Sequence, residues 1–231
     1  MSIRRKIEVF GDSILKGIQI NPLNNRYHVD NRIDVPLLES RFSLDIENRA
    51  KFGCTVTKGE QLLNRYLDES PNCEAVIMNF GGNDCDYNWA EIAQDPDGVH
   101  EQHTPVQQFV QIYTKLIRTL QEKGIRPIVT NLPPLCPQRF FDWFCKDLNK
   151  ENVFRWMTSV NTIYHVQEYY SHTVEQIARA TGARLVDIRG VFLKRYRVER
   201  FLCADGIHIN TEGQGLITEA FVNFASANAN A

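Results

Sequence analysis

The chain has 231 residues, 43% of them apolar and 23% charged, which is the composition of a globular protein large enough to bury a core. Its 26 Lys and Arg residues against 28 Asp and Glu residues give a formal net charge of −2, which offers no electrostatic case for binding nucleic acid or an anionic membrane. No run of 18 apolar residues occurs and no apolar signal region follows the basic start, so we expect a cytoplasmic protein with no membrane span. We expect residues 1–231 to form a single domain.

Short apolar segments recur along the chain and predict five β-strands. Two of them, Val76–Phe80 and Pro127–Asn131, are nearly continuous apolar runs, as expected of strands that are buried on both faces of a parallel sheet. The predicted strands cover residues 6–10, 44–48, 74–80, 126–131 and 184–188.

Helical patterns alternate with these strands. Gly124 and Gly182 follow two of the patterns as C-terminal stops, and Thr211 is the expected cap of the last helix. The alternation predicts an α/β protein whose parallel sheet is covered by helices on both faces. The predicted helices cover residues 35–42, 57–67, 106–123, 152–180 and 211–226.

Two stretches follow predicted strands and should lie at the carboxyl edge of the sheet, where α/β proteins bind ligands. Residues 85–105 are polar and irregular, whereas residues 132–150 carry three prolines and then four aromatic side chains. We interpret the aromatic stretch as the wall of a binding site, with core packing as the alternative. His100 and His103 predict a solvated loop and no metal site, because no other ligand cluster accompanies them.

Five positions of chemical interest fall after predicted strands or before the last helix: Ser13, Gly53, Asn83, Asp205 and His208. Taken singly, each has an ordinary structural explanation as a helix cap, a turn or a surface histidine. Together they meet the needs of acyl transfer. A serine nucleophile requires a histidine base, and the histidine requires an acceptor that orients it. The backbone N–H groups of Ser13 and Gly53 and the amide of Asn83 would stabilise the oxyanion.

At these residues the sequence resembles the SGNH (GDSL-type) serine esterases. The resemblance extends from residue 6 to about residue 210. The family's blocks resemble, in order, Phe10-Gly11-Asp12-Ser13, the turn at Gly53, Gly81-Gly82-Asn83-Asp84 and Asp205-Gly206-Ile207-His208. The resemblance implies Ser13 as nucleophile, His208 as base, Asp205 as its orienting acid, and supporting roles for Asp12 and Asp84.

The resemblance also implies a flavodoxin-like, three-layer α/β/α sandwich around a five-stranded parallel sheet. It implies a hydrolase of small carboxylic esters that uses no metal and no cofactor. We expect short-chain acyl or acetyl esters, including acetylated sugars. A lysophospholipase or thioesterase is the enzymatic alternative, and a noncatalytic flavodoxin-like binding module is the alternative outside enzymes.

The sequence departs from the family pattern at several points. Ile14 stands where a leucine commonly follows the serine, and residues 138–158 match no family block. Asp187, at the end of the fifth predicted strand, is an alternative orienter for His208. The six cysteines lack a C-x-x-C pair and are expected to be free thiols.

Overall fold

The computed structural model describes residues 4–69 and 72–228, and its centre is a five-stranded parallel sheet of order β4-β1-β5-β6-β7. This confirms the predicted α/β fold and its five strands. The strands are β1 (Arg5–Gly11), β4 (Leu44–Asn48), β5 (Ala75–Asn79), β6 (Arg126–Thr130) and β7 (Arg184–Val186).

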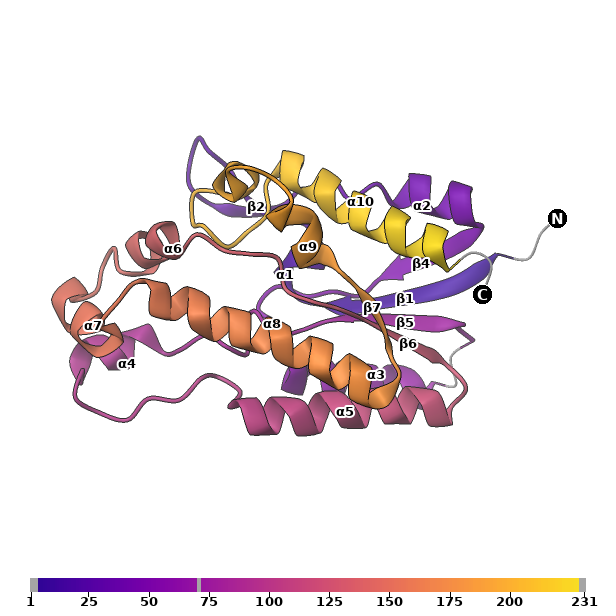
Figure 1. Ribbon diagram of the computed structural model, residues 1–231, viewed down its shortest axis with the longest axis horizontal. Helices are drawn as coiled ribbons and strands as arrows, with labels where there is room; N and C mark the ends of the chain where they lie inside the picture. The colour runs from indigo at the N-terminus through magenta and orange to yellow at the C-terminus, as the bar shows by residue number, and fades with distance from the viewer. Residues whose placement is uncertain (1–3, 70–71, 229–231) are drawn as a thin grey trace.

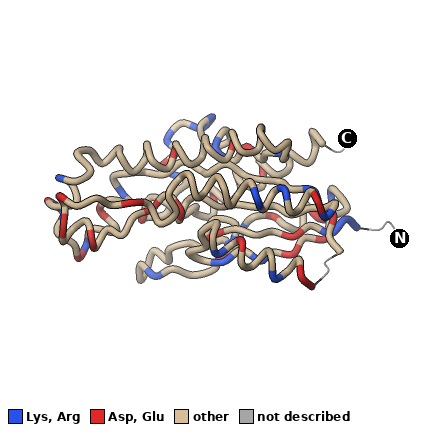
Figure 2. Tube along the Cα trace, turned by 90° about the horizontal axis from the view of Figure 1, so that it is seen from below, with Lys and Arg blue, Asp and Glu red and all other residues tan. Residues whose placement is uncertain are grey.

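Helices cover both faces of the sheet, as Figure 1 shows. One face carries α2 (Val35–Phe42), α9 (Ile188–Leu193) and α10 (Thr211–Ala227). The other carries α3 (Val56–Asp68), α5 (Val106–Glu122) and α8 (Asn161–Thr181). No helix in the described part of the chain is both long and apolar enough to cross a bilayer. Figure 2 shows basic and acidic residues interspersed along the molecule.

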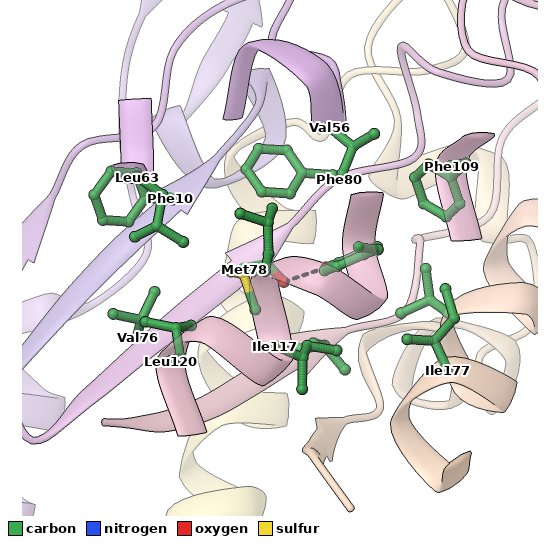
Figure 3. Packing of buried hydrophobic residues seen from close by; sticks show 14 of the residues in the cluster. Phe10, Val56, Leu63, Val76, Met78, Phe80, Phe109, Ile117, Leu120 and Ile177 are labelled. Carbon is green, nitrogen blue, oxygen red and sulfur yellow. Dashed lines mark hydrogen bonds between the residues drawn. The ribbon is translucent and has the colours of Figure 1, made fainter. Parts of the chain in front are cut away.

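The core beneath α3, α5 and α8 is built from alternate residues of the central strands. Val76 and Met78 of β5 point into it and meet Phe80, Phe109 and other fully buried side chains (Figure 3). The hydroxyl of Tyr113 donates a hydrogen bond of 3.0 Å to the carbonyl of Met78, drawn dashed in Figure 3. This packing fixes the end of β5 relative to α5, and therefore the loop that follows β5.

The strand order places a topological switch between β1 and β5. The chain leaves β1 for the neighbour on one side, β4, and leaves β5 for the neighbour on the other side, β6. The loops after β1 and β5 therefore diverge and open a crevice at the carboxyl edge, where ligands bind in folds of this order. Ser13 and Asn83 follow these two strands.

Several elements differ from the predictions. The helix expected over 152–180 is two helices, α7 (Lys150–Met157) and α8, because the chain turns at Thr158 with φ +61°. Asn210, not Thr211, caps α10: its side chain accepts from the Gly213 N–H. Residues 85–105, predicted as irregular, hold α4 (Trp89–Gln94), and residues 132–150, where no helix was predicted, hold α6 (Pro137–Phe144). The helix start expected at Asp12-Ser13 is present as the short helix α1 (Ser13–Lys16). The antiparallel pair β2 (Ile18–Ile20) and β3 (Tyr27–Val29) and the 3₁₀ helix η1 (Val198–Phe201) were not predicted from the sequence.

Candidate active site

Ser13 is the first residue of α1, directly after β1. Asp12 is the cap of this helix, since its Oδ1 accepts a hydrogen bond of 2.8 Å from the Ile14 N–H. The short helix ends at Gly17, whose φ of +74° is in the left-handed region. The Ser13 side chain is 7% exposed and lines a cavity at the carboxyl edge of the sheet. The Asp12 cap thereby holds the Ser13 backbone in place while its side chain faces the cavity.

Asp205 and His208 are joined within one tight turn before α10. His208 Nδ1 lies 2.5 Å from Asp205 Oδ2, and Asp205 Oδ1 accepts the backbone N–H groups of Ile207 and His208 at 3.2 and 3.1 Å. Gly206 allows the turn with φ +76°. The carboxylate acceptor assigns the imidazole proton to Nδ1 and leaves Nε2 as a proton acceptor.

The charge on Asp205 is retained despite full burial of its side chain. Burial raises the pKa of this carboxyl, but the hydrogen bonds and positive charge of His208, together with the Ile207 N–H, outweigh burial and hold the pKa below its usual value. An ionised Asp205 stabilises a protonated imidazole next to it.

Two aromatic rings from distant parts of the chain enclose the imidazole of His208. Tyr27, in β3, packs at 5.0 Å between ring centroids, and Phe52 stacks at 5.9 Å with an interplanar angle of 8°. The Tyr27 hydroxyl also donates a hydrogen bond of 3.3 Å to Asp205 Oδ2. Neither ring was predicted from the sequence, because neither belongs to a motif.

The turn that carries Asn83 is tied to the turn that carries Gly53. Asn83 Nδ2 donates to the carbonyl of Cys54 at 3.3 Å and to Asp12 Oδ2 at 3.4 Å. Asp84 Oδ1 accepts from the Val56 N–H at 2.8 Å, at the start of α3. These bonds link the loops after β1, β4 and β5 into one unit.

Asp12 and Asp84 are buried carboxyl groups in this unit. Burial raises the pKa of Asp12 to about 7, partly opposed by the Ile14 hydrogen bond and the charge of His208. Burial likewise raises the pKa of Asp84 to about 6. Both groups are therefore more easily protonated than an exposed aspartate.

Gly53 has φ +66°, in the left-handed region, so its turn favours glycine. A Cβ built at Gly53 would meet nothing within 4 Å. Backbone conformation, and not crowding, explains the glycine. The neighbouring Phe52 lines the cavity, whereas Gly53 itself does not.

The cavity has a volume of about 400 Å³, and Ser13, Asn83 and His208 are all among the residues that line it. Residues of both stretches expected to follow the strands also line the cavity, including Asp86, Trp89, Phe140, Trp143 and Phe144. Helix α8 adds Ile163, Val166 and Gln167. Residues 132–150 thus line the cavity, as the binding-wall interpretation required, and Phe140 and Phe141 are buried as well.

Other residues from the sequence analysis lie outside this arrangement. Asp187 Oδ1 accepts from the Gly190 N–H and from Asn131 Nδ2, both at 2.7 Å, so it caps α9 and is not bonded to His208. His100 Nε2 contacts the carbonyl of Asp95, and His103 Nδ1 contacts that of Asn83. Within the described residues no three metal-ligating side chains gather. Each of the six cysteines is a free thiol.

The sequence of this chain matches a known protein family. The family model described as the GDSL-like lipase/acylhydrolase family matches residues 9–216. No curated protein matches the sequence.

Solved structures resemble the whole fold. LAE5, an alpha/beta hydrolase enzyme from the metagenome of Lake Arreo, Spain, is 20% identical with a TM-score of 0.68, and the match covers 98% of this chain and 97% of that chain. A catalytic mutant of an acetylxylan esterase from Geobacillus stearothermophilus is 17% identical with a TM-score of 0.67, covering 97% and 96%. The lipase/acylhydrolase from Enterococcus faecalis is 19% identical with a TM-score of 0.64, covering 96% of each chain. At these identities the likeness shows the fold.

Proposed function

The chain belongs to the GDSL-like lipase/acylhydrolase family, and we propose that within this family it is a serine esterase that forms an acyl-enzyme on Ser13. The observation that carries the proposal is the Asp205–His208 pair, joined at 2.5 Å beside a cavity that Ser13 and Asn83 also line. An oriented imidazole next to a serine is the arrangement that activates the hydroxyl group.

In the proposed reaction Ser13 Oγ attacks the acyl carbon and its proton moves to His208 Nε2. The imidazolium, stabilised by Asp205, then returns the proton to the leaving alcohol. Water, activated by the same histidine, releases the carboxylic acid from Ser13. The chemistry needs no metal and no cofactor, because one residue supplies the nucleophile and another moves the proton.

The oxyanion would accept hydrogen bonds from the backbone N–H of Ser13 and from the Asn83 amide, both of which line the cavity. The N–H of Gly53, which follows the cavity residue Phe52, is the proposed third donor. The two contacts that Asn83 Nδ2 makes, at 3.3 and 3.4 Å, are long for hydrogen bonds. Such bonds are weak, so an oxyanion that carries a developing full charge would compete well for one of the two amide hydrogens. Asp12 and Asp84 support the site by holding these loops together.

For the substrate we propose short-chain acyl or acetyl esters, including acetylated sugars. The cavity lining includes Trp89, whose indole N–H donates to the carboxyl of Asp86 at 2.8 Å and whose ring stacks on Phe144 at 4.2 Å between centroids. Gln167 adds an amide to the same lining. A structural neighbour, the Geobacillus enzyme, is an acetylxylan esterase.

The apolar side chains of the same lining favour a second candidate, an acyl hydrolase for longer chains such as a lysophospholipase or thioesterase. Leu132, Phe140, Phe144 and Ile163 would contact a hydrocarbon chain there. A noncatalytic binding module is disfavoured, because the family is one of acylhydrolases.

A panel of nitrophenyl esters tests the proposal. The parent should hydrolyse acetyl and butyryl esters, and Ser13→Ala should lower kcat by at least about 10³-fold. The exposed Ser226 provides the matched control, since Ser226→Ala removes a hydroxyl far from the cavity. Undiminished turnover by Ser13→Ala would overturn the proposal, and a strong preference for long chains in the parent would favour the second candidate.

A further inference from the structure

A second cavity, of about 120 Å³, lies on the sheet face that α2 and α10 cover. Its floor is made by β-strand residues and its roof by the two helices, which Figure 1 places side by side above the sheet. The lining includes Ile7, Ile77 and Ile128 from the strands, Leu38 from α2, and Phe221 and Phe224 from α10. This cavity is separate from the one that contains Ser13.

Three arginines stand at the amino end of the same sheet face. Arg5, Arg126 and Arg184 are the first residues of β1, β6 and β7. Side chains in a strand alternate between the two faces, so each arginine shares its face with the residue two positions on. Those residues are Ile7, Ile128 and Val186, all in the core beneath α2 and α10. All three arginines also line the cavity.

Among the described residues, an acidic side chain balances the charge of only one of these three arginines. Arg126 forms an ion pair with Glu74, and Arg5 donates to the carbonyl of Phe42 at 3.1 Å. Within residues 4–69 and 72–228, Arg5 and Arg184 form no ion pair. Burial, and then the positive charges of Arg184 and Arg5, lower the pKa of Arg126, as expected of guanidinium groups held near one another. An anion between them would relieve this repulsion.

We propose that this cavity binds a linear monocarboxylate, with its carboxylate on the Arg126 and Arg184 side chains and its alkyl chain between α2, α10 and the sheet. A planar guanidinium matches a carboxylate with two parallel hydrogen bonds. Apart from the arginines and Asn31, Asn48 and Asn228, the lining is apolar, so polar groups along most of the tail would be unpaired, which favours a hydrocarbon tail. The small volume accommodates one thin chain and no ring system.

This proposal goes beyond the esterase activity and does not depend on it. A monocarboxylate belongs to the class of acid that an ester hydrolase releases. The second cavity would therefore bind such an acid at a place separate from the cavity that contains Ser13. The arginine end of the site is at the opposite edge of the sheet from Ser13, since strands of a parallel sheet all begin at one edge and end at the other. The other end of the cavity reaches Leu15 of α1 and Asn48, the last residue of β4.

Isothermal titration of octanoate into the full chain tests the proposal, with hexanoate for comparison. We expect saturable one-to-one binding, and a gain of about fourfold in affinity for each methylene added until the cavity is full. Arg184→Gln should weaken octanoate binding by at least about tenfold. Ala225→Leu, which adds bulk to the cavity lining, should weaken it by a similar factor.

Lys123→Gln is the matched control, because it removes one positive charge next to β6 but outside the cavity lining. It should leave octanoate affinity within about twofold, and all three variants should keep the esterase activity of the parent. Arg184 is only half-buried, so we expect Arg184→Gln to fold. This variant alone can test the proposal if Ala225→Leu does not fold.

Three outcomes would overturn the proposal. One is the absence of saturable binding at millimolar octanoate. Another is octanoate binding that survives both variants, which would place the acid in the cavity of Ser13. The third is a parent that sediments as a dimer and that Arg184→Gln converts to a monomer, which would assign this face to a second copy of the chain.

Discussion

The hydroxyl of Tyr27 donates a hydrogen bond of 3.3 Å to Asp205 Oδ2, across 178 positions of the sequence. The same carboxylate oxygen accepts the proton of His208 Nδ1. Tyr27 lies in β3, so this small hairpin places a phenol over the Asp205–His208 pair. The relationship makes Tyr27 a candidate positioning residue that acts through Asp205.

Tyr27→Phe keeps the ring against His208 and removes only the hydrogen bond. A single such bond is worth about 0.5–1.5 kcal/mol, so we expect kcat to fall about two- to tenfold with KM little changed. Steady-state kinetics on a nitrophenyl ester provide the measurement, and Tyr196→Phe, at a fully exposed tyrosine, is the control. Equal kinetics for parent and Tyr27→Phe would show that the hydrogen bond does not act on the imidazole.

Asp205→Asn tests which acid orients His208. An amide at this position would donate to Nδ1, place the imidazole proton on Nε2 and prevent it from accepting the serine proton. We expect kcat to fall by about 10³-fold or more. Asp187→Asn is the paired control, because Asp187 caps α9 and contacts Asn131. Loss of activity in Asp187→Asn with Asp205→Asn active would reverse the assignment.

Asn83→Ala removes the proposed side-chain donor to the oxyanion. The donor acts on charge that develops only in the transition state, so kcat should fall by about 10²–10³-fold while KM changes little. Asn223→Ala, on the exposed surface of α10, should have no effect. A rise in KM with unchanged kcat would instead mean that Asn83 binds the substrate in its ground state.

Asp12 should make the stability of the fold depend on pH. Its pKa is about 7 in the folded protein against 3.8 for the exposed group, so the folded state holds the proton more tightly. That contribution is fully present below about pH 4 and is lost as the pH rises through about 7. The full shift corresponds to about 4 kcal/mol, as an upper limit.

Urea unfolding of the parent and of Asp12→Asn between pH 4 and pH 8 measures this effect. The amide can still accept the Ile14 N–H but does not ionise, so the parent should lose stability relative to the variant as the pH rises. The exposed Asp45 serves as control, and the difference between parent and Asp45→Asn should vary less over this range. A parent that gains stability relative to Asp12→Asn with rising pH would contradict the assigned direction.

Much of the fold could be predicted because apolar runs and helical periodicity are local signals. The sheet strands at Val76 and Ile128 were recognisable as continuous apolar runs. The break between α7 and α8 was not, since Thr158 adopts a left-handed conformation without a glycine or proline to announce it. The β2–β3 pair was missed because each strand has three residues and those of β3 are exposed.

The residues of the candidate site also divide into those that the sequence predicted and those that it did not. Ser13, Asn83, Asp205 and His208 were found because a chemical requirement and a short motif point to each. Tyr27 and Phe52 contact His208 only through the tertiary fold, so no local pattern marks them. The catalytic roles stay predictions, whereas the proximity of the Asp205 and His208 side chains is a feature of the structure.

Covalent labelling with a fluorophosphonate, followed by peptide mapping by mass spectrometry, tests the central claim most directly. An activated serine reacts with this reagent, whereas an ordinary surface serine does not. The account predicts one adduct, on the peptide that contains Ser13, with labelling lost in Ser13→Ala and strongly slowed in His208→Ala. An unlabelled parent, or an adduct on any other residue, would contradict it.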